Sequence, residues 1–272
     1  MPGLKTIPTP PKYNWKRDLP DARDHIYDTT SAPATLPAVV DLRVYCSPIE
    51  DQGQLGSCTA NAIAGIVEYT DIREGKATAN NPLRVSRLFI YYQERLLEGT
   101  VSQDSGAYIR DGIKACYTYG APLETLWPYN INRFAVQPPQ AAYTDALKRK
   151  VTGYAKCADF TAVKTAIAQN HPVVIGFDVY SSFESGTWWY PSGSGLMPYP
   201  NTRRESLLGG HAVALVGYND NLSGPAGKGY FIARNSWGTS WGQNGYFYMP
   251  YSVIKDTTMS SDFWTVSVVA NP

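Results

Sequence analysis

The sequence predicts an α+β fold in which helices dominate the first half of the chain and strands dominate the second. Apolar residues recur at helical spacing after Ser57, whereas β-rich apolar runs follow His171-Pro172. Helices and strands that are segregated along a chain are typical of α+β proteins. The change of character near residues 130–150 also indicates two lobes, and ligand sites commonly lie in the cleft between lobes.

The individual helices and strands follow from periodicity and from stop signals. Apolar positions from Ala60 to Val67 lie at helical spacing, so we expect a buried helix that begins at Cys58 and stops at residues 73–75. Further helices are expected over residues 86–97, 106–119 and 161–169. Strands are expected over residues 173–180, 211–218, 229–236, 245–249 and 263–269. Between two of these strands, residues 219–228 predict a flexible hairpin loop.

Composition and charge exclude several classes of protein. The chain is 43% hydrophobic and 17% charged, which excludes a disordered or fibrous protein. A formal net charge of +1 predicts no nucleic-acid partner. No apolar run approaches the ~20 residues of a membrane span, so no membrane partner is expected. Residues 1–15 lack the apolar run of a secretory signal; the sequence as given predicts synthesis in the cytoplasm, with export by another route left open.

Cys58 is the candidate nucleophile among the four cysteines. A thiol reacts as the thiolate, and a helix amino terminus stabilises that charge. The turn before Cys58 contains Gly53 and Gly56, which let another backbone approach closely, and Gln52 places a side-chain amide six residues before the thiol. Such an amide can donate to an oxyanion that develops beside the Cys58 N–H. Without these neighbours, a cysteine at a helix start would more often be an inert buried residue.

Two later segments supply a candidate histidine and a residue to orient it. His211 begins an apolar strand directly after Gly209-Gly210, where a lone histidine is often structural. Asn235 opens the run Asn-Ser-Trp-Gly-Thr-Ser-Trp-Gly-Gln-Asn-Gly-Tyr. An asparagine can hold an imidazole toward a thiol, and Trp237 can shield that hydrogen bond from water. Core packing is the simpler role for a tryptophan, and we expect it for Trp241.

These segments resemble the papain family of cysteine peptidases. The family signature around the nucleophile is Q-G-x-C-G-S-C-[WY], and residues 52–58 keep its glutamine, both glycines, its serine and its final cysteine. Residues 235–246 resemble the family motif N-S-W-G-x-x-W-G-x-x-G-Y almost letter for letter. Leu55 stands where the family has a structural cysteine, and Thr59 where it has an aromatic residue. The absent cysteines and the brief amino-terminal segment are similar to a bacterial branch of the family.

The resemblance implies a papain-like two-lobe fold with the active-site cleft between the lobes. Within a catalytic domain of residues 39–272, it implies a helical lobe over about residues 50–130 and a β-barrel-like lobe over about residues 131–268. Residues 1–38 are rich in proline and form an expected arm or short pro-segment. We expect this arm to lie along the cleft and inhibit the enzyme, running in the reverse sense so that no peptide bond is positioned for attack. Its expected apolar anchors are Tyr13, Trp15, Ile26 and Tyr27. The alternative is that the arm packs on the lobes as structure alone.

The resemblance also implies the chemistry: a cysteine-type endopeptidase with Cys58 as nucleophile and His211 as general acid and base. Asn235 would orient His211, and Gln52 would stabilise the oxyanion. Neither a metal nor an organic cofactor is implied. Residues expected near the substrate are Ser105, Gly106, Tyr108, Gly210, Ala212 and Trp237. For Tyr108, Gly210 and Ala212, ordinary packing is an equally good interpretation.

Two alternatives to peptide hydrolysis stay open. A papain-like scaffold can bind peptides without cleaving them, but such proteins usually lose the nucleophile or the histidine, and this chain keeps both. In a peptide ligase, an amine replaces water in the second step, and the sequence does not separate the two reactions. In each case the partner is a peptide or protein, and we expect a monomer.

The cysteines give three further expectations. The resemblance implies a Cys46–Cys157 disulfide, because the family fold brings their segments together in the strand-rich lobe. Cys116 falls on the apolar face of an expected helix and should be a buried free thiol. Cys58, at a helix start opposite His211, should have a pKa well below the ordinary value of about 8.5, which predicts a bell-shaped dependence of activity on pH.

Overall fold

The structure is a computed structural model that describes residues 12–270. Residues 1–11 of the expected arm therefore lie outside the described residues. Between residues 12 and 270, no helix is long and apolar enough to cross a lipid bilayer.

All four helices expected from periodicity are present, with ends shifted by at most three residues. The helices are α1 (Cys58–Arg73), α2 (Arg87–Leu97), α3 (Ile109–Thr118), α4 (Gln140–Ala146), α5 (Phe160–Ala168), α6 (Ser181–Glu184) and α7 (Tyr251–Lys255), with the 3-10 turns η1 (Arg43–Tyr45), η2 (Ile131–Arg133) and η3 (Leu147–Arg149). Helices α4, α6 and α7 were not predicted, because each is too short to show a helical period. Helix α3 begins later than expected because Ala107 and Tyr108 form a strand instead.

The strands form one large open sheet and one small pair. They are β1 (Trp15–Lys16), β2 (Val39–Asp41), β3 (Ala107–Tyr108), β4 (Lys150–Lys156), β5 (Val173–Tyr180), β6 (Leu207–Gly224), β7 (Gly227–Arg234), β8 (Tyr246–Pro250) and β9 (Ser260–Ala270). The large sheet has the order β4-β9-β5-β6-β7-β8, with β2 added beside β6. Among the described strands, β4 and β8 end this order without pairing with each other. The barrel-like lobe expected from the resemblance is thus an open sheet.

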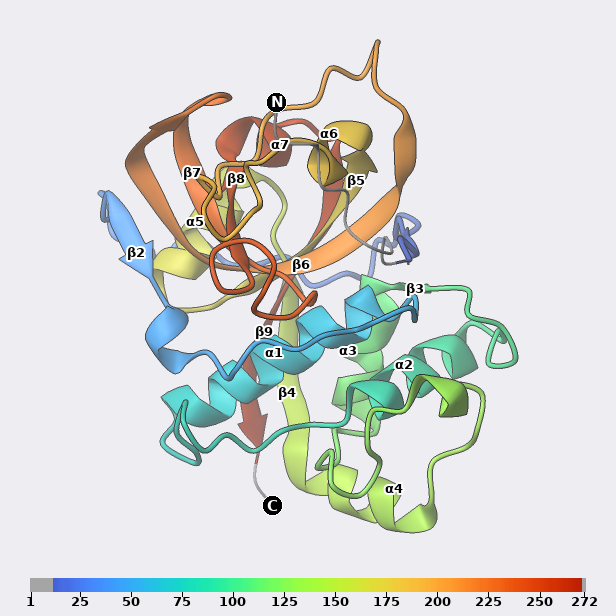
Figure 1. Ribbon diagram of the computed structural model, residues 1–272. Coiled ribbons are helices and arrows are strands. Elements are labelled where there is room, and N and C mark those ends of the chain that lie inside the picture. Colours follow the sequence, from blue (N-terminus) through green and yellow to red (C-terminus); the bar gives the residue numbers. More distant parts are fainter. Residues whose placement is uncertain (1–11, 271–272) are drawn as a thin grey trace.

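Helix α1 lies at the centre of the molecule and carries the candidate nucleophile at its first turn. Figure 1 shows α1 to α4 in the lower half and strands β5 to β8 in the upper half, an arrangement that confirms the α+β class. Helix α1 packs against α2 and α3 on one side and against β6 on the other. Its small and branched apolar residues are buried almost all round for this reason.

The expectation of a flexible loop over residues 219–228 was wrong. Strands β6 and β7 continue their antiparallel pairing to Ser223–Lys228 and Gly224–Gly227, so the turn consists of Pro225 and Ala226. The side chains in this part of the strand pair are mostly polar, so they lack the apolar alternation from which strands are predicted. The backbone groups pair with one another here, so the pairing does not need apolar side chains.

The predicted Cys46–Cys157 disulfide is also wrong, because all four cysteines are free and buried. The two thiols lie in different surroundings. Cys46 follows η1, with its Sγ 3.8 Å from the Leu42 carbonyl oxygen, whereas the Cys157 N–H donates to the carbonyl of Phe263 in β9. The prediction that Cys116 is a buried free thiol is confirmed.

The described part of the arm touches both the helical region and the sheet. Strand β1 pairs in parallel with β3, which directly precedes α3. Asn14 forms a parallel bridge to Gly210 of β6, and Ile26 forms another to Lys156 of β4. The arm therefore crosses from one region to the other beside the first residues of β6, where His211 lies.

Candidate active site

Cys58 is the first residue of α1 and is completely buried. The backbones of Ala212 in β6 and Asn14 in the arm both hydrogen-bond to its thiol. Cys58 and the start of β6 are thus brought together by the packing of α1 on the sheet. The sequence prediction that Cys58 begins a buried helix is confirmed.

His211 is held in one orientation and one tautomer by Asn235, which lies one residue beyond β7. The distance between His211 Nε2 and Asn235 Oδ1 is 2.8 Å. The Ser236 N–H also donates to Asn235 Oδ1 over 2.9 Å, which fixes the orientation of the amide. Because that oxygen can only accept, His211 carries its proton on Nε2 when neutral. Nδ1 is left as the basic nitrogen and has no hydrogen-bond partner among the described residues.

Trp237 covers the same imidazole. Its ring stacks on His211 with 4.8 Å between centroids and 28° between planes. Trp237 also packs edge-on against Trp241, and both tryptophans are buried. Water is thereby excluded from one face of the His211–Asn235 pair, which strengthens the hydrogen bond between them.

Gln52 lies beside this group with its amide orientation fixed from both ends. The Ser236 hydroxyl donates to Gln52 Oε1 over 2.7 Å, so Nε2 is the end that faces away from Ser236. One Nε2 hydrogen is donated to the Leu55 carbonyl over 3.1 Å. An amide nitrogen carries two hydrogens, so one donor remains for a substrate oxygen. The Gln52 backbone is held as well, because its N–H donates to the Ser236 carbonyl.

The remaining residues expected near the substrate lie around this group, with one exception. Gly106 (φ +67°) lies directly against the Asn14 carbonyl, and Gly210 lies against the ring and backbone of Trp15. Lys16 of the arm lies over the Tyr108 ring. The Ser105 hydroxyl instead bonds to Thr100 Oγ1 and to the adjacent Gly106 carbonyl. Its side chain is therefore engaged within its own loop.

Thr59, which stands where an aromatic residue was expected from the resemblance, makes a different contact. Its hydroxyl donates to the Glu94 carboxyl over 2.9 Å, and both side chains are buried. Burial raises the pKa of Glu94 well above its ordinary value. Burial thus favours the neutral form of a carboxyl that lies under the first turn of α1, where a carboxylate would oppose a Cys58 thiolate.

The arm closes the site from the solvent side. The Tyr13 ring contacts His211 and Trp237 at centroid distances of 6.0 and 5.8 Å, and its hydroxyl donates to Glu184. The Trp15 ring fills a space that exists because residues 176 and 210 are glycines; a Cβ at either would overlap the indole. Tyr13 and Trp15 are two of the residues expected from the sequence to anchor the arm through apolar contacts, and both make such contacts here.

Burial under the arm favours the neutral forms of Cys58 and His211, whereas the sequence predicted a thiolate and an imidazolium. Burial raises the pKa of the Cys58 thiol to about 11, against the smaller opposite effect of the backbone hydrogen bonds. Burial also lowers the pKa of His211 to about 4, and its hydrogen bond with Asn235 offsets this only in part. The prediction of a depressed Cys58 pKa is therefore wrong for the covered site, where both groups are neutral near pH 7.

Asp104 is a residue that sequence reasoning missed. Its carboxyl accepts from the Gly56 N–H over 3.0 Å and from the Tyr91 hydroxyl over 2.6 Å. Lys12 of the arm also reaches it, at 2.7 Å. Asp104 thus ties together the turn before Cys58, helix α2 and the arm. The available signal was an acidic residue two positions before Gly106.

The site combines a buried thiol at a helix start, an imidazole held by an amide, and a second side-chain amide. On this fold, such a combination defines a cysteine peptidase. Comparison with known proteins agrees. The model of the papain family cysteine protease matches residues 36–266. The chain belongs to this family and is a hydrolase.

Among solved structures, the chain is similar to xylellain, a cysteine protease from Xylella fastidiosa. The two are 37% identical, the match covers 95% of this chain and 96% of xylellain, and the TM-score is 0.80. The resemblance to a bacterial branch is thereby confirmed. Procathepsin B of Trypanosoma congolense, at 19% identity, shares the fold with a TM-score of 0.71 over 96% of this chain and 87% of that one.

Two relatives extend the similarity to other lineages. An uncharacterized peptidase C1-like protein of Acanthamoeba polyphaga mimivirus is 42% identical over 82% of this chain and 70% of its own length. Cysteine proteinase 3 of Entamoeba histolytica is 29% identical over 81% of this chain. The match spans 66% of the length of that Entamoeba protein.

Proposed function

We propose that this protein is a cysteine endopeptidase that its own N-terminal arm holds inactive. The observation that supports this proposal most directly is the convergence of Cys58, His211 and Gln52 beneath Tyr13 and Asn14 of the arm. Cysteine peptidase activity in general follows from the family. The cleavage of internal bonds, the roles of the residues and the inhibition are the parts that we propose.

In the proposed reaction, the Cys58 thiolate attacks the carbonyl carbon of a peptide bond and forms a tetrahedral intermediate. Gln52 Nε2 and the Cys58 N–H donate to its oxyanion. His211 then gives its Nδ1 proton to the leaving amine, and the acyl group stays on sulfur as a thioester. Neutral His211 next takes a proton from water, whose oxygen attacks the thioester and releases the acid. Asn235 supports both transfers by keeping Nε2 protonated.

The arm inhibits in two ways under this proposal. Its residues Tyr13 to Trp15 occupy the space that a substrate would need beside Cys58 and Gly106. The same cover removes water, so the neutral thiol and the neutral imidazole are favoured over the thiolate–imidazolium pair. When the arm leaves, hydration returns and the reactive pair can form.

The direction of the arm is compatible with inhibition without self-cleavage. Strand β1 runs parallel to β3, which supports the expected reverse orientation. A chain that lies in the reverse sense presents no carbonyl carbon in line with Cys58. The procathepsin B structure is, by its title, that of a proenzyme, and it shares this fold.

Cleavage products of a denatured protein substrate test the proposed activity. Full-length protein that carries Trp15→Ala, a change expected to loosen the arm, should yield new internal termini by mass spectrometry, and an epoxysuccinyl inhibitor should label its Cys58 at one equivalent. Cys58→Ala should abolish both results, whereas Cys116→Ala is the matched thiol control and should retain them. Trimming confined to the substrate ends would contradict an endopeptidase. The absence of both cleavage and labelling would indicate a peptide-binding scaffold, and joining to an added peptide amine in preference to hydrolysis would indicate a ligase.

A further inference from the structure

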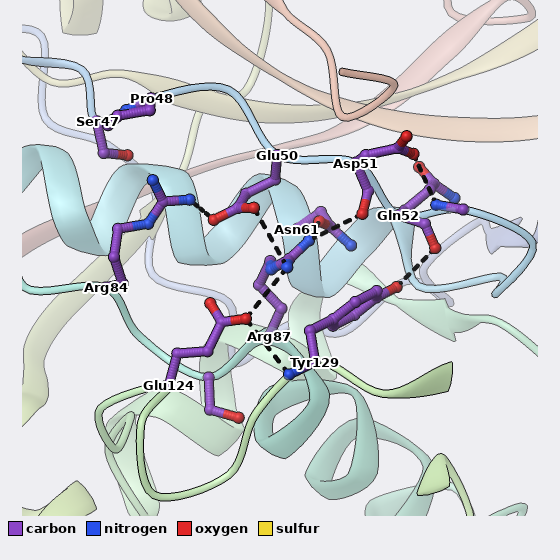
Figure 2. Close-up of polar contacts among 12 residues, drawn as sticks. Ser47, Pro48, Glu50, Asp51, Gln52, Asn61, Arg84, Arg87, Glu124 and Tyr129 are labelled. Carbon is purple, nitrogen blue, oxygen red and sulfur yellow. Dashed lines mark hydrogen bonds and ion pairs between the residues drawn. The ribbon is translucent and has the colours of Figure 1, made fainter. Parts of the chain in front are cut away.

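A buried chain of hydrogen bonds runs from Arg87 in α2 to the backbone of Gln52. Arg87 Nη1 donates to Asn61 Oδ1 over 2.9 Å, and Asn61 Nδ2 lies 3.0 Å from the Ser57 hydroxyl. The Ser57 hydroxyl is 2.6 Å from that of Tyr129, which donates to the Gln52 carbonyl over 2.9 Å. Figure 2 shows Arg87 among Glu50, Asn61, Glu124 and Tyr129, and the Tyr129 hydroxyl directed at Gln52.

The donors in this chain can point in only one direction. A guanidinium has no acceptor, so Arg87 fixes Oδ1 as the end of the Asn61 amide that faces it. Asn61 Nδ2 therefore donates to Ser57. At the other end, the Gln52 carbonyl can only accept, so Tyr129 gives it its single proton. The bond between the two hydroxyls is then donated by Ser57. Each hydroxyl therefore has a defined proton position, and hydrogen bonds aligned in this way polarise and strengthen one another.

The chain also clamps both ends of the turn between Gln52 and Cys58. Tyr129 bonds to Gln52 at the start of the turn and to Ser57 at its end. Asn61 adds a second bond at the end, from Nδ2 to the Ser57 carbonyl over 2.9 Å. Arg87 adds one at the start, from Nη1 to the Asp51 carbonyl over 3.2 Å. The spacing between the Gln52 amide and the Cys58 N–H depends on this turn.

Arg87 is itself fixed on its other sides. Its side chain is 5% exposed and lies between Glu50 and Glu124, whose carboxyl oxygens are 3.2 and 3.3 Å from Nη2. Its guanidinium carbon lies 3.8 Å from the centroid of the Tyr129 ring. Glu124 also accepts from the Tyr129 N–H, so the same carboxyl holds both the Arg87 guanidinium and the Tyr129 backbone. A planar, permanently charged fork suits this position, and a lysine would not reproduce its contacts.

We propose that Arg87 and Tyr129 are positioning residues for oxyanion stabilisation, acting through Gln52. This inference rests on the proposed function, since it assumes that Gln52 donates to the oxyanion. Neither residue touches the substrate. Their contribution is to hold two donors at the spacing that the tetrahedral intermediate requires, which a shift of about 1 Å would disrupt.

The test compares Tyr129→Phe with its parent in full-length protein that also carries Trp15→Ala, which loosens the arm. Loss of the hydroxyl should lower kcat about tenfold and leave KM within about twofold, because the lost bond acts on the transition state. Affinity for a peptide aldehyde, which forms an oxyanion on Cys58, should fall by the same factor as kcat. The rate of alkylation of Cys58 by iodoacetamide, which forms no oxyanion, should not change.

Two further variants separate positioning from a general structural role. Tyr143→Phe removes a hydroxyl that accepts from Gln93 Nε2 and is no member of the chain from Arg87 to Gln52, so it should leave all readouts unchanged. Asn61→Asp keeps an oxygen for Arg87 but offers Ser57 an acceptor in place of a donor. The Ser57 proton would then turn away from Tyr129. We expect aldehyde affinity to fall severalfold. The melting temperature is measured alongside, because the same change removes the bond to the Ser57 carbonyl while the Arg87 contact gains an opposite charge.

The outcomes distinguish failure of this inference from failure of the proposed function. Gln52→Ala is the reference and should lose aldehyde affinity at least as strongly. If Gln52→Ala loses affinity while Tyr129→Phe and Asn61→Asp do not, the positioning role is wrong and the proposed function stands. If Gln52→Ala changes neither kcat nor aldehyde affinity, the proposed oxyanion donor is wrong. Equal losses in alkylation and aldehyde binding for Tyr129→Phe would also overturn the inference, since they would indicate damage to the thiol or the fold.

Discussion

The Tyr13 ring meets the His211 imidazole edge-on, with 6.0 Å between the ring centroids and 77° between the planes. Tyr13 belongs to the arm, and His211 belongs to the group that surrounds Cys58. The arm therefore contacts a proposed catalytic side chain directly, and not only the rim of the site. Docking of the arm and ionisation of the reacting groups are physically linked for this reason, and the first two predictions follow from that link.

We expect Trp15→Ala in the full-length protein to raise the rate of peptide hydrolysis at least about tenfold. The Trp15 side chain is buried against Gly176 and Gly210, so its loss removes much of the apolar contact that holds the arm in the cleft. Hydrolysis of a fluorogenic peptide measures the effect. Leu19→Ala is the matched control, because Leu19 lies in the same arm with 70% of its surface exposed. Equal rates for both variants and the wild type would show that the arm does not inhibit.

Arm docking should be strongest in the middle of the pH range and weaker at both ends. His211 has a pKa lowered to about 4 in the covered site. Its contribution to the free energy of arm docking is therefore complete above its pKa in the open site and is lost as pH falls toward 4. Cys58 has a pKa raised to about 11, so its contribution is complete below its open-site pKa and is lost as pH rises toward 11. The ratio of the iodoacetamide rates of Trp15→Ala and wild type should therefore peak near neutrality. A ratio that does not vary with pH would contradict this linkage.

Asp18→Asn should stabilise the protein at pH 8 but not at pH 5. Burial, and after it the nearby charge of Asp262, raise the pKa of Asp18 to about 7, against the hydrogen bond from Trp264 and the charge of Arg110. A raised carboxyl pKa means that the contribution to stability is complete below the unfolded value of about 3.9 and is lost as pH rises through 7. Melting temperatures at both pH values measure the effect. A larger gain at pH 5 than at pH 8 would refute it.

Alkylation of the denatured, non-reduced protein should find four thiols. Cys46, Cys58, Cys116 and Cys157 are all free and buried, and burial raises the pKa of each. Intact mass after iodoacetamide treatment in denaturant counts the adducts directly. Two adducts would show that a disulfide forms after all. Four adducts in denaturant, compared with few under native conditions, would agree with the burial seen here.

The local features of the site could be predicted from the sequence, because short motifs specify them. The helix that begins at Cys58 follows from its apolar spacing and preceding glycines. The pairing of His211 with Asn235 was expected from the family motif, and the structure brings the two together. Helix and strand positions followed from periodicity for the same reason. These signals all lie within a few residues of the feature that they predict.

The features that could not be predicted depend on contacts between distant segments. The pKa values of Cys58 and His211 are set by burial under the arm. The arm lies about 45 residues from Cys58 and about 200 from His211 along the chain, so no local pattern predicts that burial. The expected disulfide was wrong because it assumed that segments which the family fold brings together also bring their thiols within bonding distance, and no local pattern fixes that geometry. The chain of hydrogen bonds from Arg87 to Gln52 draws on three separate segments, around residues 52–61, 87 and 129, so its members showed no pattern in the sequence.

The second attachment of the arm, where Ile26 lies beside Lys156 on β4, makes the proposed inhibitor a tethered ligand. Tyr27 and Lys156 add backbone bonds there, well away from Cys58 along the arm. Release of Tyr13 to Trp15 from the cleft therefore does not require dissociation from the protein, and rebinding occurs at an effective concentration set by the short intervening segment. Inhibition of this kind is unaffected by dilution. Activation consequently calls for a cut or for a competitor in the cleft, and a lower protein concentration alone will not bring it about.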